Sequence, residues 1–351
     1  MDKKKKYRIL LISPMLPSIG GISISVEKMR KRLVMDGHDV SVINIRFKNK
    51  KFNNNKLLLF VRFALIPFMV LFKRRFDIIH CHIAGGYRKC YISFFNFLYK
   101  KASLIYSIHG DVSYMLDDSK SLYAVNKADG VICVQEGDSE KLRHYLKPSV
   151  LSSDFPAFFA CSIDCDNTLP PAIQSFTSLN SDPLIVVCGK IAILSAFYDL
   201  YGMLDAAELF ARLRDKGFAA KMLMLVIGDV SNKEQIAVIQ KIKDIVGDDE
   251  NFMMSESVIA MEPIFTKAQM YIRPTKTDGD SLSVREALAC GCPVLASNVS
   301  KRPEGTVLYD GSIDDMEAKA IKTLSSPNDN KHIVVDFYNN LIEFYDQVYN
   351  R

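Results

Sequence analysis

The chain has 351 residues, a hydrophobic content of 48% and a net charge of +5, and this length favours two domains over one. With 21 Phe and 15 Tyr it can fill two hydrophobic cores, which excludes an extensively disordered protein. Residues 1–150 carry 27 Lys and Arg against 12 Asp and Glu, whereas the remainder carries 18 against 28. The basic half therefore favours an anionic partner, a membrane surface or a phosphate-bearing substrate; no nucleic-acid recognition pattern accompanies the charge.

The eight cysteines lie mostly alone in apolar runs such as 187–189, which is typical of small buried side chains in a reducing compartment. The pairs at 161/165 and 290/292 have no second pair at zinc spacing, so we expect no disulfide framework and no bound metal. A lysine-rich start leads into a short apolar run without a signal-peptide cleavage site. We therefore expect a cytoplasmic protein.

The first half reads as alternating strands and helices. The apolar run Arg8–Ser13 predicts a strand buried on both faces of a parallel sheet, followed by a helix over 25–35 and a strand over 39–45. Three more strands are predicted, over 77–82, 104–109 and 130–134. This pattern predicts an α/β, Rossmann-like domain over residues 1–166.

The second half repeats the rhythm after a linker predicted over 164–183, which is rich in Pro, Ser and Asn. These elements predict a second Rossmann-like domain over 167–331, with a closing helix from residue 332 to the end at 351. The predicted strands are 184–188, 221–227, 270–273 and 293–297, and the predicted helices are 202–216, 234–246, 283–289 and 314–324.

The most apolar segment, Leu57–Phe72, has basic residues on both sides. Its 16 residues are too few to span a bilayer, which takes about 20. Two interpretations stay open: a buried or groove-lining helix of the first domain, or a membrane-surface helix whose basic flanks meet anionic headgroups. The second would place the protein at the inner face of the cell membrane.

Several residues of the first half lie where predicted strands end. Gly20 and Gly21 precede the first helix, where they can admit a phosphate to the helix N-terminus or form a plain tight turn. The pattern is not G-x-G-x-x-G, which disfavours a dinucleotide site. His109 ends a strand at the sheet edge where ligands bind. His80 and His82 share one face of a strand but have no evident third zinc ligand, so we interpret them as structural or cleft-lining.

The polar loop after the strand 270–273 enters a predicted helix. Asp278 lies in the loop and Glu286 in the helix, so both carboxylates can address one polyhydroxylated ligand. Helix capping by Asp278 or Ser281 would explain either residue alone, but less well the whole string. Small residues at a helix entrance form a candidate anion site. Its backbone comprises Gly279, Asp280, Ser281, Leu282 and Ser283.

The string from Arg273 to Ser297 resembles the signature of the family 4 retaining glycosyltransferases of bacterial polysaccharide synthesis. That signature is E-x7-E followed by Ala-Leu/Met-Ala-x-Gly-x-Pro-Val-x-Ala-Ser. Asp278 and Glu286 have this spacing, with Asp in place of the usual first Glu. Other segments resemble the same family along nearly the whole chain; they are residues 13–22, 37–40, 77–82, 107–110 and 128–131.

The resemblance implies a GT-B fold, in which two facing Rossmann-like domains carry parallel sheets and a C-terminal helix crosses back onto the first domain. It implies acceptor binding by the first domain, nucleotide-sugar binding by the second, and a donor sugar between them. Glu286 would hold the nucleotide ribose, and Asp278 with 279–283 would hold the sugar hydroxyls and a phosphate. Gly21 would approach the diphosphate, and His109 would border the reacting sugar.

One position departs from the family pattern, which usually has an Arg and a Lys after the first strand of the second domain. Here Lys190 supplies one cation, but Tyr201 stands where the Lys is expected. Lys190, the helix N-terminus and another cation, such as Arg273, Lys276 or Arg285, would then stabilise the leaving diphosphate. A weak or inactive family member is the alternative.

The resemblance thus predicts a retaining, metal-independent transferase of a hexose or N-acetylhexosamine. The donor would be a nucleoside-diphosphate sugar, UDP favoured over GDP, and the acceptor a glycan or lipid-linked intermediate of surface polysaccharide synthesis. Asp278-Gly279-Asp280 resembles a metal-binding D-x-D motif, but helix dipoles and basic side chains take the metal's role in this family. Two alternatives stay open: a nucleotide-sugar epimerase of similar fold, and a catalytically silent carbohydrate-binding homologue.

Overall fold

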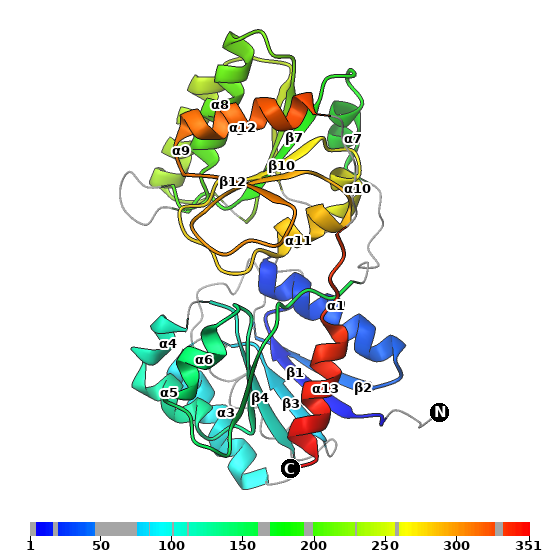
Figure 1. Ribbon diagram of the computed structural model, residues 1–351, viewed down its shortest axis with the longest axis vertical. Coiled ribbons are helices and arrows are strands. Elements are labelled where there is room, and N and C mark those ends of the chain that lie inside the picture. Colours follow the sequence, from blue (N-terminus) through cyan, green and yellow to red (C-terminus); the bar gives the residue numbers. More distant parts are fainter. Residues whose placement is uncertain are drawn as a thin grey trace. The chain divides into compact units, whose positions relative to one another are not determined.

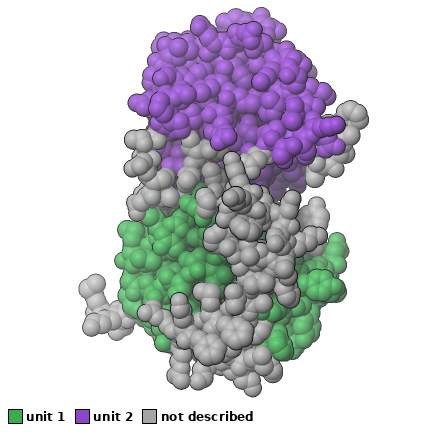
Figure 2. Space-filling view, turned by 180° about the vertical axis from the view of Figure 1, so that it is seen from behind, with its two compact units in different colours: residues 1–163, 336–351 green, residues 164–335 purple. Residues whose placement is uncertain are grey.

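The computed structural model describes most of the chain as two compact units. Unit 1 comprises residues 1–163 and 336–351, and unit 2 comprises 164–335 (Figure 2). The boundaries expected from the sequence follow residues 166 and 331. The described residues are 5–16, 20–45, 76–83, 85–99, 102–110, 112–160, 169–192, 199–228, 230–256, 260–326 and 333–351.

Unit 1 contains a six-stranded sheet in the order β2-β1-β3-β4-β5-β6, with every neighbouring pair parallel (Figure 1). The five strands predicted for this half are confirmed to within one residue at each end, and β6 was not predicted. The strands are β1 (Arg8–Ser13), β2 (Asp39–Asn44), β3 (Ile78–Cys81), β4 (Ser103–Ile108), β5 (Gly130–Cys133) and β6 (Leu151–Asp154).

Helices cover both faces of this sheet. One face packs against α1 (Gly21–Met35) and α13 (Tyr338–Tyr349). The other packs against α3 (Gly86–Tyr99), α4 (Ser113–Leu116), α5 (Ser119–Val125) and α6 (Asp138–Arg143). Because the strands are buried on both sides, they read as continuous apolar runs. The segment 57–72, with its two interpretations, lies outside the described residues.

The closing helix begins six residues later than expected, at Tyr338. The Asp336 carboxylate accepts hydrogen bonds from the backbone N–H of Tyr338 (3.1 Å) and of Ala160 (3.3 Å), which ties the preceding segment to unit 1 in a non-helical conformation. From there α13 lies directly on the sheet, because Gly130 of β5 has no side chain to hold it off. A Cβ at Gly130 would come within 2.9 Å of Phe344 and Val348.

Unit 2 contains a second six-stranded parallel sheet, in the order β12-β11-β10-β7-β8-β9. Counted from β7, this is the 3-2-1-4-5-6 order of doubly wound nucleotide-binding domains. The four strands predicted here are confirmed, whereas β9 and β12 were not predicted. The strands are β7 (Leu184–Gly189), β8 (Lys221–Val226), β9 (Phe252–Glu256), β10 (Met270–Arg273), β11 (Val294–Ser297) and β12 (Thr306–Tyr309).

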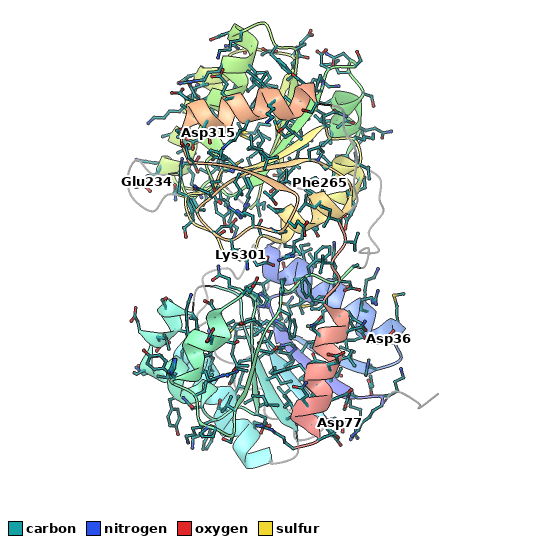
Figure 3. The ribbon with its side chains drawn as sticks, in the orientation of Figure 1. Asp36, Asp77, Glu234, Phe265, Lys301 and Asp315 are labelled. Carbon is teal, nitrogen blue, oxygen red and sulfur yellow. The ribbon has the colours of Figure 1, made fainter. Side chains whose placement is uncertain are left out.

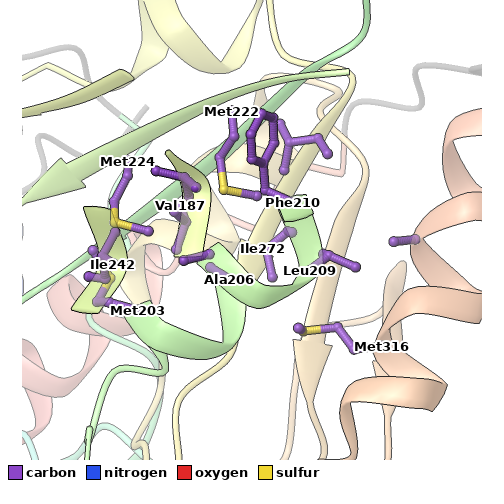
Figure 4. Packing of buried hydrophobic residues seen from close by; sticks show 14 of the residues in the cluster. Val187, Met203, Ala206, Leu209, Phe210, Met222, Met224, Ile242, Ile272 and Met316 are labelled. Carbon is purple, nitrogen blue, oxygen red and sulfur yellow. The ribbon is translucent and has the colours of Figure 1, made fainter. Parts of the chain in front are cut away.

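The second sheet also has helices on both faces. On one side α8 (Met203–Asp215), α9 (Lys233–Val246) and α12 (Ile313–Ser325) enclose a core in which Phe210 and Met222 pack together (Figure 4). On the other lie α7 (Pro171–Thr177), α10 (Glu262–Phe265) and α11 (Leu282–Ala289). None of the helices in the described part of the chain is long and apolar enough to cross a membrane.

The expected linker over 164–183 is wrong for residues 171–177, because these form α7. Proline fits the first turn of a helix, where its missing N–H would have no partner anyway, and Pro171 starts α7. Ile173 and Phe176 then bury their side chains against the second sheet.

Replacing Gly130 by alanine tests the packing of α13 on unit 1. The added methyl group collides with Phe344 and Val348, and overpacking of this kind costs about 1–3 kcal/mol of unfolding free energy. Urea unfolding measures the loss. Gly110→Ala is the control, since its Cβ meets no described atom within 4 Å. Equal effects of the two substitutions would contradict the packing described here.

Candidate functional site

In both sheets the candidate residues lie beside the point at which the strand order reverses. In unit 2 the strand order reverses between β7 and β10, which are followed by Lys190 and by the loop 274–281. In unit 1 it reverses between β1 and β3, which are followed by the segment leading to Gly20 and by His82. Open α/β sheets bind ligands beyond the carboxyl ends of the strands at such points.

The loop after β10 is organised around the carboxylate of Asp278. Arg273 donates to it twice, from Nε to Oδ2 at 2.9 Å and from Nη2 to Oδ1 at 3.1 Å. Arg302 donates from Nη1 to Oδ2 at 2.7 Å. Burial alone would raise the pKa of Asp278, but the two guanidinium groups outweigh it and lower the pKa below its usual value. Asp278 is therefore a largely buried, ionised carboxylate between two arginines.

Arg302 was missed by the sequence analysis. It lies 24 residues beyond Asp278, next to Lys301, which Figure 3 labels in the segment between β11 and β12. Its side chain is only 1% exposed. No spacing rule connects the segment after one strand with the loop after its neighbour, so only the parallel pairing of β10 with β11 shows that the two meet.

The helix α11 presents its N-terminus at this loop. Ser281 is the N-cap residue, yet its side chain makes no capping hydrogen bond to the first amides of α11. The Ser281 hydroxyl instead faces that of Ser283 at 3.2 Å, and Ser283 faces the Tyr271 hydroxyl at 2.7 Å. Uncapped amides and the positive end of the helix dipole suit an anion. Glu286 follows on α11 and is 7% exposed.

The other charged residues of the loop are paired. Arg285 donates from Nε to the Asp280 carboxylate at 2.8 and 3.0 Å, and Lys276 forms an ion pair with Asp205 of α8. Burial raises the pKa of Asp280, and the charge of Arg285 opposes that rise. Asp278 and Asp280 thus each face guanidinium groups. Within the described ranges, no group of three His, Cys, Asp or Glu residues could hold a metal ion.

The position that departs from the family pattern packs against the same cluster. The Tyr201 ring lies 5.2 Å from the Arg273 guanidinium carbon, which is cation–π geometry. Gly202, at φ +65, has no room for a side chain, because a Cβ would lie 2.0 Å from the carbonyl oxygen of Pro274. Lys190 follows β7 directly and is half-buried. An aromatic ring thus lies over Arg273 at the position where the family resemblance predicts a lysine.

In unit 1 the helix α1 begins at Gly21, four residues before the predicted start. Gly20 is its N-cap residue, and its carbonyl oxygen accepts hydrogen bonds from the Ile24 N–H (3.1 Å) and the Ser23 hydroxyl (2.9 Å). The paired glycines therefore form the first turn of α1. Gly20 forms no side-chain cap because it has no side chain.

The three histidines form a row in which His80 and His82 are buried and His109 is half-buried. His80 contacts the Tyr345 hydroxyl through Nδ1 (2.7 Å) and the Ser107 hydroxyl through Nε2 (2.8 Å). His82 Nδ1 lies 2.8 Å from His109 Nε2. Burial lowers the pKa of His80 to about 3, with a contribution from His109, and that of His109 to about 4. Burial also lowers the pKa of His82, so all three rings are neutral at pH 7.

The hydrogen bond between His82 and His109 has a preferred direction. In this structure His82 Nε2 is buried and has no partner among the described atoms. A buried N–H without an acceptor is rarer than a buried acceptor without a donor. We therefore assign the proton to His82 Nδ1, which donates to His109 Nε2. His109 then carries its own proton on Nδ1.

Two family models match the sequence. "Glycosyltransferase Family 4" matches residues 19–150, and "Glycosyl transferases group 1" matches residues 188–326. Together the two matches span most of both units. The chain belongs to glycosyltransferase family 4.

Solved structures show that this glycosyltransferase has the GT-B fold. Starch synthase IV from Arabidopsis thaliana, bound to ADP and acarbose, has a TM-score of 0.70 at 11% identity, covering 99% of this chain and all of that one. Sucrose-phosphate synthase from Thermosynechococcus elongatus has a TM-score of 0.65 at 13% identity, and the match covers 97% of this chain and 95% of that one. HepE from Anabaena, in complex with UDP and glucose, has a TM-score of 0.64 at 13% identity, and the match covers 97% of this chain and 95% of that one. A search of curated proteins finds no significant match.

The histidine row should make the glycosyltransferase sensitive to acid. The lowered pKa of His109 means that between about pH 6.5 and 4 the unfolded chain binds a proton that the folded chain does not. The stability is thus complete above pH 6.5 and falls as the pH drops, by up to about 1.4 kcal/mol per pH unit for one histidine. Urea unfolding between pH 7 and 4.5 measures this loss, and His109→Asn should make it shallower. An unchanged slope in that variant would contradict the assignment.

Proposed function

We propose that this chain is a retaining glycosyltransferase that takes its sugar from a nucleoside-diphosphate donor bound by unit 2. The observation that carries the proposal is the loop at the β7/β10 reversal. There the uncapped start of α11 and the Arg273–Asp278–Arg302 cluster meet, within a segment that the family model matches. The bound UDP of HepE and the bound ADP of starch synthase IV support a nucleotide donor.

The chemistry follows from where charge develops. As the sugar leaves, negative charge grows on the diphosphate, and preorganised dipoles and cations lower the barrier most effectively there. In our proposal the first amides of α11 and the ammonium group of Lys190 meet this charge. Glu286 binds the ribose. Attack from the face that the diphosphate leaves, with a phosphate oxygen taking the acceptor proton, retains the anomeric configuration and needs neither a protein base nor a metal ion.

Unit 1 would bind the acceptor. The basic balance of residues 1–150 suits a phosphate-bearing or lipid-linked glycan at the inner face of the cell membrane. His109, oriented by His82, would present its Nδ1–H to a sugar hydroxyl. These features support a role in surface polysaccharide synthesis, with a hexose or N-acetylhexosamine as the transferred sugar.

A thermal-shift panel with UDP, GDP and ADP tests the proposal. A ligand that binds only the folded state stabilises it by about 2.7 kcal/mol when present at 100 times its Kd, so one nucleotide should raise the melting temperature clearly. We expect UDP to give the largest shift. The absence of a shift with every nucleotide would instead favour a silent homologue. Conversion of the donor to its epimer without an acceptor would favour an epimerase.

Removing the Glu286 carboxylate should weaken nucleotide binding. Hydrogen bonds to a charged group contribute about 1.5–3 kcal/mol, so Glu286→Ala should raise the Kd of the selected nucleotide about 10- to 100-fold, as measured by calorimetry. Glu304 is an exposed carboxylate of the same unit, and Glu304→Ala should leave the Kd unchanged. Near-normal binding by Glu286→Ala would refute the role of this residue.

A further inference from the structure

We propose that Asp278 and Arg302 form a positioning pair that holds the loop 274–281 against α11, and that Asp278 does not contact the donor sugar. The inference rests on the nucleotide site proposed for unit 2. It departs from the role that the family resemblance gives to the first carboxylate, which is to hold sugar hydroxyls. It also assigns a role to Arg302, which lies outside the E-x7-E signature.

Most of the acceptor capacity of Asp278 is already used. A carboxylate offers about four lone-pair positions, and four donors point at this one. They are Nε and Nη2 of Arg273, Nη1 of Arg302 and the hydroxyl of Thr275 at 3.3 Å. The side chain is 12% exposed. Three of these donors meet at Oδ2 and only one, Arg273 Nη2, at Oδ1. A sugar hydroxyl could therefore bind to Asp278 only at the second position of Oδ1 or by displacing one of these donors.

Arg302 connects two segments that follow neighbouring strands. Besides Asp278, its guanidinium donates to the Ser297 carbonyl oxygen at the end of β11 (3.1 Å) and to the Thr275 hydroxyl in the loop (3.2 Å). Ser297 adds a hydrogen bond from its hydroxyl to the Thr275 carbonyl oxygen (2.6 Å). The loop is thus tied to the sheet at Thr275 and at Asp278, immediately before the first turn of α11.

The charges of the cluster explain why a carboxylate is needed. Two buried guanidinium groups, those of Arg273 and Arg302, meet at this carboxylate. Without the negative charge of Asp278, no charge between them would offset their mutual repulsion. Removing one member of a buried ion pair is more destabilising than removing both. The single variant Asp278→Asn therefore raises the cluster charge from +1 to +2. The double variant D278N/R302M returns it to +1.

A positioning role and a ligand role predict different binding patterns. If Asp278 holds the loop, its loss displaces the amides of 279–283, and a displacement of about 1 Å can cost up to about a hundredfold. The affinities for the bare nucleotide and for the nucleotide sugar then fall by the same factor. If Asp278 binds the sugar instead, only the nucleotide sugar weakens.

The experiment measures the Kd of UDP and of UDP-glucose by calorimetry for wild type, D278N, R302M and D278N/R302M; GDP and GDP-mannose replace them if the panel selects GDP. We expect D278N and R302M to weaken both ligands equally, about 10- to 100-fold. The double variant should bind both ligands no more weakly than either single variant, because each single substitution already breaks the same Asp278–Arg302 pair. R302K keeps the charge and should recover part of the affinity.

The control is R212M. Arg212 lies in the last turn of α8 and donates hydrogen bonds to Glu208, Asp314 and Glu317. R212M should leave both Kd values unchanged, which separates loop positioning from a general loss of stability. Should a single variant fail to fold, the charge-conserving double variant still provides the UDP to UDP-glucose comparison. Loss confined to UDP-glucose, or unchanged binding in R302M, would overturn this inference alone. Wild-type protein that binds no nucleotide would instead overturn the proposed function.

Discussion

The sharing of one buried carboxylate between two arginines is the constraint on which the candidate donor site depends. Asp278 joins Arg273, at the end of β10, to Arg302, in the segment after β11. Breaking a buried pair by removing one partner costs about 3–5 kcal/mol, so the loop between β10 and α11 has one strongly preferred conformation. In that conformation the N-cap residue Ser281 makes no capping hydrogen bond to the first amides of α11, which suits this helix N-terminus to an anion.

The same cluster contacts the position at which the family resemblance predicts a second cation. Tyr201 lies over Arg273 where a lysine is expected, and Gly202 is required because Pro274 approaches it closely. The Arg273–Asp278–Arg302 cluster thus adds a net charge of +1 to the loop, beside the α11 amides and Lys190 that we propose to meet the diphosphate charge. A rigid arrangement of this kind would need no reorganisation as charge grows on the diphosphate of our proposal.

Most of the fold could be predicted from the sequence, because strands buried in a parallel sheet are continuous apolar runs. Each predicted strand was based on such a run. Errors arose where local chemistry outweighs periodicity. Pro171 was interpreted as part of a linker but starts α7, and Asp336 delays α13 by an Asx-type hydrogen bond. The strands β6, β9 and β12 lie at or near sheet edges and are less buried, so their apolar signal is weaker.

The candidate site was predictable only where its residues are contiguous. Asp278 and Glu286 lie in one motif, whereas Arg302 reaches the loop through the pairing of two strands, and the contact of His82 with His109 depends on the pairing of β3 with β4. A crystal structure of the protein with UDP-glucose tests the central claim most directly. The account predicts a phosphate oxygen within hydrogen-bond distance of the first α11 amides, and Asp278 still bound to both arginines. An Asp278 carboxylate turned onto the glucose hydroxyls, with Arg302 released, would contradict it.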